Sequence, residues 1–207
     1  MPLVTLSAPY GAGGSQVGPL VADRLGVPFV DRAVPSRVAE RMAVPLDPAL
    51  SRDESIGSWL ARSSVWLGHV GSVLSAVPPP GGLEDEDRFR RETEAVLREH
   101  AAGAGAVVLG RAGALVLRDV RGALHVRLQG SVEARVRQAM RLENIDRATA
   151  TQRRDQLDTA REAYVRHFYH ADPADPAHYQ LVLDSTVLPV SACAGLIVSA
   201  VRALEGR

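Results

Sequence analysis

The sequence predicts an α/β protein built on a five-stranded parallel sheet. Short apolar runs alternate along the chain with segments whose apolar residues recur at helical spacing. This alternation is typical of strands joined by right-handed helical crossovers, which make the strands parallel. A length of 207 residues and a hydrophobic content of 46% are sufficient for a substantial core. Because no internal repeat or linker interrupts the pattern, we expect a single domain over residues 1–207.

The predicted strands are short, and helical segments separate them. The strands cover residues 3–6, 27–30, 106–109, 124–128 and 179–183. The helices cover residues 17–25, 33–42, 56–77, a segment that begins near 84, a segment after Ser131, and 189–204. Ser131 is the expected N-cap of its helix, since a serine hydroxyl accepts hydrogen bonds from first-turn amides. His125 and Arg127 share one face of the fourth strand.

The segment between the first strand and the first helix is rich in small residues. Gly11, Gly13 and Gly14 allow left-handed backbone angles, so successive N–H groups can face one concavity. The following helix adds its free amides and the positive end of its dipole. These features predict a phosphate-binding loop, with a ligand-free turn as the alternative. In the register of the motif G-x-x-x-x-G-K-[ST], Gly14 stands at the lysine and Ser15 at the hydroxyl.

Composition excludes several classes of function. The 24 basic and 24 acidic residues balance, so no overall field favours nucleic acid or a membrane surface. The sequence contains no lysine, so phosphate chemistry here depends on arginine. The single cysteine, Cys193, excludes an intramolecular disulfide. With no secretory leader pattern and no apolar run near 20 residues, we expect a cytoplasmic protein.

Two polar or aromatic groupings have more than one interpretation. Arg153, Arg154 and Arg161 alternate with acidic residues in a polar helical stretch. This pattern fits a solvated, salt-bridged helix pair, or a mobile lid that brings guanidinium groups over phosphates. Trp59 and Trp66 share one helical face, which favours core packing or a homodimer surface over a base-stacking platform.

Five segments, in order, resemble motifs of the cytidylate kinase-like family, a branch of the P-loop nucleoside monophosphate kinases. They are the glycine loop at 7–14, the strand at 25–31, Gly110-Arg111, Ser131-x-Glu133-x-Arg135, and the stretch from Tyr164 to the turn at 184–186. The glycine loop resembles the loop of that branch, in which glycine also stands at the lysine position. The resemblance covers almost the whole chain.

The resemblance implies a P-loop kinase fold with a helical lid. It implies a core at residues 1–46, 104–143 and 178–207, an acceptor-side helical insertion at about 47–103, and a lid at about 144–177. It also implies that ATP and Mg²⁺ supply a phosphoryl group to a nucleoside monophosphate, with CMP or dCMP as the first expected acceptor.

The resemblance further implies roles for individual residues. The residues expected to hold the donor phosphates are Gly11, Ala12, Gly13, Gly14, Ser15, Gln16 and Arg153, with Ser15 also near Mg²⁺. Arg111 is expected to hold the acceptor phosphate, and Asp31 to face the acceptor or a metal-bound water. Arg154 and Arg161 are expected to close over the transferred group.

Two other functions stay open from the sequence. Gly14 replaces the loop lysine, and Ala112 stands where cytidylate kinases have an aspartate after the Gly-Arg pair. One alternative is therefore a catalytically weak nucleotide-binding protein with a regulatory role. Another is a kinase of a different small acceptor.

Overall fold

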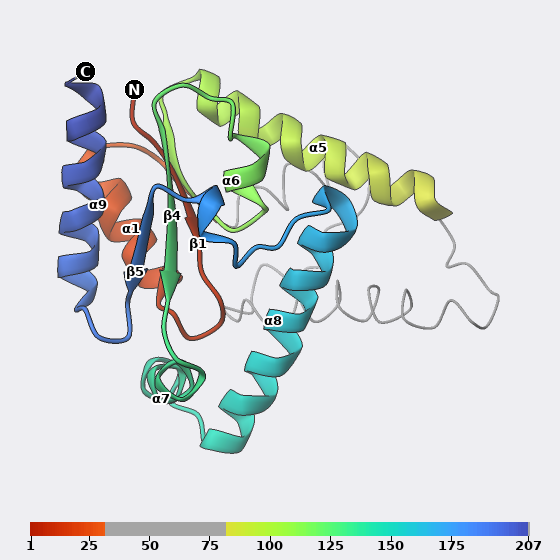
Figure 1. Ribbon diagram of the computed structural model, residues 1–207, viewed down its shortest axis with the longest axis vertical. Coiled ribbons are helices and arrows are strands. Elements are labelled where there is room, and N and C mark those ends of the chain that lie inside the picture. The colour runs from red at the N-terminus through yellow and green to blue at the C-terminus, as the bar shows by residue number, and fades with distance from the viewer. Residues whose placement is uncertain (32–81, 207) are drawn as a thin grey trace.

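The computed structural model describes residues 1–31 and 82–206 (Figure 1). The predicted helices at 33–42 and 56–77, with Trp59 and Trp66, lie outside these residues.

Within residues 1–31 and 82–206, five parallel strands form one sheet. The strands are β1 (Leu3–Ser7), β2 (Phe29–Val30), β3 (Ala106–Leu109), β4 (Ala123–Gln129) and β5 (Leu181–Asp184). Their order is β2-β3-β1-β4-β5, and every neighbouring pair is parallel, which confirms the predicted sheet. The strand before the glycine loop, β1, is central, so the loop lies at the middle of the carboxyl edge.

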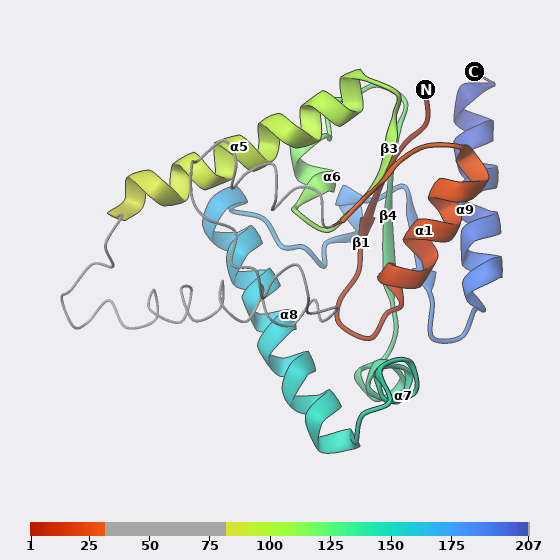
Figure 2. The same ribbon diagram turned by 180° about the vertical axis from the view of Figure 1, so that it is seen from behind.

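Helices cover both faces of the sheet. In the described residues they are α1 (Gly14–Leu25), α5 (Gly82–Ala102), α6 (Gly113–Val116), α7 (Val132–Glu143), α8 (Arg147–Tyr169), a 3₁₀ turn η2 (Pro176–His178) and α9 (Val190–Glu205). The helices α1 and α9 lie on one face, and α5 and α6 on the other (Figure 2). The helix α7 lies beyond the carboxyl ends of the strands, and α8 runs back from it along the α5–α6 side (Figures 1 and 2). No helix in these described residues is long and apolar enough to span a membrane.

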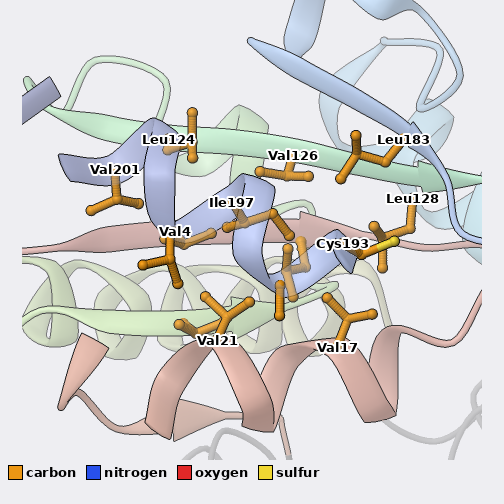
Figure 3. Close-up of a cluster of buried hydrophobic side chains, with 14 of the residues drawn as sticks. Val4, Val17, Val21, Leu124, Val126, Leu128, Leu183, Cys193, Ile197 and Val201 are labelled. Atoms are coloured by element: carbon orange, nitrogen blue, oxygen red, sulfur yellow. The ribbon is translucent and has the colours of Figure 1, made fainter. Parts of the chain in front are cut away.

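The larger core cluster lies between the sheet and the α1–α9 layer. Val17 and Val21 of α1 and Ile197 of α9 meet Val4 and Val126 of the sheet (Figure 3). All five side chains are fully buried. Burial of an aliphatic side chain of this kind contributes about 1.5–3 kcal/mol, so this layer anchors both strands and the start of α1.

The other face of the sheet contains a buried polar pair. Thr5 of β1 and His125 of β4 are opposite each other in the register, and Thr5 Oγ1 lies 2.8 Å from His125 Nδ1. Burial lowers the pKa of His125 from its ordinary value. The imidazole is therefore held neutral, with Nδ1 able to accept from the threonine hydroxyl.

Several element boundaries differ from the predicted ones. The helix α1 begins at Gly14 instead of 17, because Gly13 adopts a left-handed N-cap conformation directly before it. The strand β5 begins at Leu181 instead of 179, because Tyr179 is the C-cap of η2 and its amide donates to Pro176 O. The predicted N-cap is confirmed, since Ser131 Oγ accepts from Ala134 N over 3.3 Å.

Candidate active site

The glycine loop forms an open cradle of backbone amides. Gly11 (φ 75°) and Gly13 (φ 72°) are left-handed and flank Ala12. Gly13 O accepts the amides of Gln16 and Val17, both over 3.0 Å. The amides of Gly13, Gly14 and Ser15 precede that first bonded position, where a helix leaves its N–H groups without intrahelical acceptors. Such a group of amides at a helix N-terminus suits an anion.

The packing around Gly14, which stands at the lysine position of the P-loop motif, leaves room for glycine only. A Cβ on Gly14 would lie 2.8 Å from Leu109 Cδ1 and 2.9 Å from the Ala8 Cβ. The space that the first carbon of a lysine side chain needs is therefore occupied by two apolar side chains. A cation for this site has to come from elsewhere in the chain.

One such cation comes from α8. Arg161 Nη1 donates to the Ala8 carbonyl oxygen at the start of the loop, over 3.1 Å. Burial lowers the pKa of Arg161, and the neighbouring carboxylates of Asp158 and Asp31 oppose that shift. An arginine remains charged in such surroundings, so the loop has a guanidinium group fixed beside it.

A second guanidinium group lies on the acceptor side. Arg111 follows β3, and Asp31 follows the adjacent strand β2, so both lie at the carboxyl edge. Burial lowers the pKa of Arg111, Tyr164 and Asp31 oppose the shift, and Arg161 adds to it. Asp31 therefore acts on both arginines, and the predicted residues Asp31, Arg111 and Arg161 lie together.

The backbone around Arg111 is held in an uncommon conformation. Gly110, Arg111 and Ala112 have φ values of 74°, 58° and 51°, three consecutive left-handed residues. Only the first is a glycine, and each non-glycine residue in this region costs about 1–2 kcal/mol. These left-handed angles turn the chain sharply between β3 and α6. The position of Arg111 within this turn determines the direction in which its side chain leaves the sheet edge.

The other predicted arginines of α8 form different contacts. Arg153 Nη1 pairs with Glu143 Oε2 over 2.5 Å. Arg154 pairs with Asp155 through Nη2, while its Nε is buried and has no hydrogen-bond partner among the described residues. The Arg153–Glu143 pair lies beside the Tyr10 side chain of the loop, whereas Arg161 is the predicted α8 arginine that donates to the backbone of the loop.

Three further residues contact the loop and have no role predicted from the sequence, and one of them is Arg135, whose Nη1 donates to Tyr10 O over 2.8 Å. Asp158 accepts from Tyr10 N over 2.8 Å and from Arg135 Nη1 over 2.6 Å. Ser185 Oγ donates to Ala12 O over 2.7 Å. A sequence signal existed for Asp158, because Arg154, Asp158 and Arg161 are spaced by four and three residues and so share a helix face.

The residues of the loop fit a nucleotide phosphate better than a protein-held metal. The amides of Gly13, Gly14 and Ser15 suit phosphate oxygens, and Ser15 is exposed at the start of α1. Within residues 1–31 and 82–206 no group of three or more His, Cys, Asp or Glu side chains could hold a metal ion. Mg²⁺ is typically held by substrate phosphates, waters and one or two protein oxygens, and Ser15 could supply one of these.

The fold and the loop define the class of protein. A shikimate kinase from Bacteroides thetaiotaomicron superposes with a TM-score of 0.52 at 16% identity, covering 100% of this chain and 99% of that chain. An uncharacterized protein from Eubacterium ventriosum superposes with a TM-score of 0.67 at 14% identity, covering 98% and 99%. The chain therefore has a P-loop kinase fold.

Sequence comparison identifies the family within this class. The model of the cytidylate kinase-like family matches residues 3–187, and the chain belongs to that family. Family and fold together support a nucleotide-binding phosphotransferase. A curated relative, a uronate isomerase from Corynebacterium glutamicum, is 27% identical over 150 residues, which are 72% of this chain. The matched region is only 28% of that relative's length.

Proposed function

We propose that the protein transfers the terminal phosphoryl group of ATP, bound with Mg²⁺, to a nucleoside monophosphate, with CMP or dCMP as the first candidate. The cytoplasm, which holds the nucleotide pools, is the proposed compartment. The observation that supports this most is the grouping of Arg161, Arg111 and Asp31 beside the glycine loop. Arg161 and Arg111 repel each other and both interact with the Asp31 carboxylate, and a bound phosphate near both guanidinium groups would relieve that repulsion.

In this proposal the donor phosphates lie on the amides of the glycine loop. Gly11, Gly13, Gly14 and Ser15 would bind phosphate oxygens, with Ala12 and Gln16 beside them, and the Ser15 hydroxyl would face Mg²⁺. Bound Mg²⁺ would neutralise charge on the phosphates. The role of the protein is then to hold donor and acceptor in line and to stabilise charge, because phosphoryl transfer needs little covalent chemistry from the enzyme.

The acceptor side and the lid have separate tasks. Arg111 would hold the acceptor phosphate, and Asp31 would orient the acceptor or a metal-bound water. Arg161, already on the loop, would lie next to the transferred group. Arg154, whose Nε has no partner among the described residues, and Arg153 would join it when the lid, residues 144–177, closes.

The test is ADP release with ATP and Mg²⁺ against a panel of nucleoside monophosphates and nucleosides. We expect acceptor-dependent turnover that falls by roughly 10²–10³ in Arg111→Ala and Arg161→Ala, because each change removes a positioned cation. Arg166→Ala is the matched control, since that arginine lies on the same helix in an exposed ion pair with Glu162. Unchanged turnover in both site variants would show that these roles are wrong.

Two alternatives are separated by the same experiment. Ala8 and Leu109 fill the space that a side chain at position 14 would need, and Arg153 and Arg154 are held in ion pairs. Both observations favour a regulatory protein that binds nucleotide with weak or no turnover. That alternative predicts binding by calorimetry without product. The relative named uronate isomerase is a reason to add uronates to the panel, as acceptors for a kinase of another small molecule.

A further inference from the structure

Three residues join the glycine loop to both helices of the α7–α8 hairpin. Asp158 of α8 accepts Tyr10 N with Oδ1 (2.8 Å) and Arg135 Nη1 with Oδ2 (2.6 Å). The same Arg135 Nη1 donates to Tyr10 O over 2.8 Å. The contacts therefore close a ring through the loop, α7 and α8, which we call the loop latch (Tyr10, Arg135 and Asp158).

The latch is shielded from solvent. The side chains of Arg135 and Asp158 are only 9% and 19% exposed. Removal of one partner from such a shielded pair leaves the other charge without compensation, which is far more costly than breaking a surface pair. The contact is therefore strong enough to constrain the loop.

The Tyr10 side chain adds a second attachment at the same residue. Its ring belongs to a buried apolar cluster with α7 and α8, formed with Val136, Ala139, Ala150 and Leu157. Main chain and side chain of Tyr10 are thus both fixed to the hairpin. A shift of the hairpin would have to move Tyr10 or break its contacts.

The latch lies next to the phosphate cradle and leaves it open. Tyr10 directly precedes Gly11, whose added Cβ would lie 2.3 Å from the Arg135 carbonyl oxygen. The backbone of α7 therefore supports the loop from behind. The amides of Gly13 to Ser15 lie further along the loop and are not used by the latch.

We propose that Asp158 is a positioning residue that, through Arg135 and Tyr10, holds the glycine loop in its phosphate-binding form and couples that form to the α7–α8 hairpin. The inference rests on the proposed function, because it concerns the same loop. It makes a prediction opposite to simple electrostatics. Removal of a carboxylate near an anion site should strengthen anion binding, whereas loss of the latch should weaken it.

The experiment compares the Asp158→Asn and Asp158→Ala variants with the unaltered protein. We expect the dissociation constant for magnesium ADP to rise roughly tenfold in Asp158→Ala, within the range of about 5–150-fold typical of coupling between sites. Asp158→Asn should have a smaller effect, because an amide oxygen can still accept from Tyr10 N. Hydrogen exchange of peptides covering residues 10–16, measured without nucleotide, should accelerate in the same order.

The matched control is Glu133→Gln. It breaks a different ion pair between the two helices, Glu133 Oε2 with Arg147 Nη2 at 2.6 Å, which is exposed and includes no loop residue. Tighter binding of magnesium ADP in the Asp158 variants, or unchanged loop exchange, would overturn the proposal. Equal acceleration in Glu133→Gln would also overturn it, since general loosening of the hairpin would then be the cause.

The exchange measurement separates this inference from the proposed function. It needs no substrate, so a protein without turnover would still show accelerated loop exchange if the latch exists. Conversely, the unaltered protein could show acceptor-dependent turnover while loop exchange is unchanged in the Asp158 variants. That result would leave the proposed function intact and reject the latch. If Asp158→Ala fails to fold, Asp158→Asn supplies both readouts.

Discussion

The hydroxyl of Ser185, directly after β5, donates to the carbonyl oxygen of Ala12 in the glycine loop over 2.7 Å. Both residues are buried, Ser185 at 5% exposure and Ala12 at 0%. The residue after β5 thus holds the loop in addition to the contacts from α7 and α8. The shape of the cradle depends on segments that are distant in the chain.

This contact predicts a loss of stability in Ser185→Ala. The Ala12 carbonyl would stay buried without its donor, which costs about 1–3 kcal/mol. In a protein of this size each kcal/mol corresponds to a melting temperature lower by about 2–4 °C. Thermal unfolding measures the effect, with Ser191→Ala, an exposed position at the start of α9, as the control. An equal melting temperature in both variants would contradict the role of the hydroxyl.

The left-handed turn after β3 predicts a stabilising substitution. Ala112 has φ 51° and is the N-cap of α6, so Ala112→Gly should relieve backbone strain. After the greater entropy of glycine in the unfolded chain is included, we expect a gain of about 0.5–1 kcal/mol. Ala114→Gly, inside the same short helix, should have the opposite sign. Denaturant unfolding compares the two variants, and a loss of stability in both would argue against strain at position 112.

The packing around Gly14 predicts that restoring a lysine will not restore a lysine-dependent site. Gly14→Lys would force its Cβ against Ala8 and Leu109, and overpacking of this kind costs about 1–3 kcal/mol. We expect a lower melting temperature and no gain in ADP release. Ala8→Gly combined with Gly14→Lys should recover part of the stability, because one of the two close contacts is removed. Higher turnover in the single variant at unchanged stability would refute this expectation.

The buried His125 predicts a pH dependence of folding. Because burial lowers its folded-state pKa, the unfolded chain binds a proton at a higher pH than the folded one. The stability from this residue is complete above the unfolded pKa of about 6.5 and decreases as the pH falls below it. Chemical unfolding between pH 8 and pH 5 should show this decrease, and His125→Gln should reduce it. An identical pH profile for both proteins would exclude His125 as the cause.

The order of elements could be predicted because each strand is marked locally. The apolar run before the glycine loop and the glycines themselves determine β1 and the left-handed positions Gly11 and Gly13. Asp31 directly follows β2 and Arg111 follows β3 after Gly110, so parallel strands bring them to one edge of the sheet. Those placements needed only the alternation of strands and helices.

The partners of charged side chains could not be predicted in the same way. Arg153, Arg154 and Arg161 look alike in sequence, yet the first two pair with Glu143 and Asp155 while the third donates to Ala8 O. Which arginine reaches the loop depends on how α8 is rotated about its axis. The packing of Tyr10 against Leu157 helps to determine that rotation. The short helix α6 was likewise absent from the predicted elements, because three consecutive left-handed residues precede it and two of them are not glycine.

The contacts of the glycine loop also have a consequence for the order of folding. The loop is among the first residues of this sequence to leave a ribosome, but Arg135, Asp158, Arg161 and Ser185 contact it across 125 to 173 positions. Contacts that close such long stretches of chain form slowly, since the entropy of closure is lost before the contact is gained. During synthesis the glycine loop therefore cannot complete its contacts until the residue after β5 has been made, and a nascent chain that ends before Ser185 contains every loop residue without the Ser185 contact to Ala12.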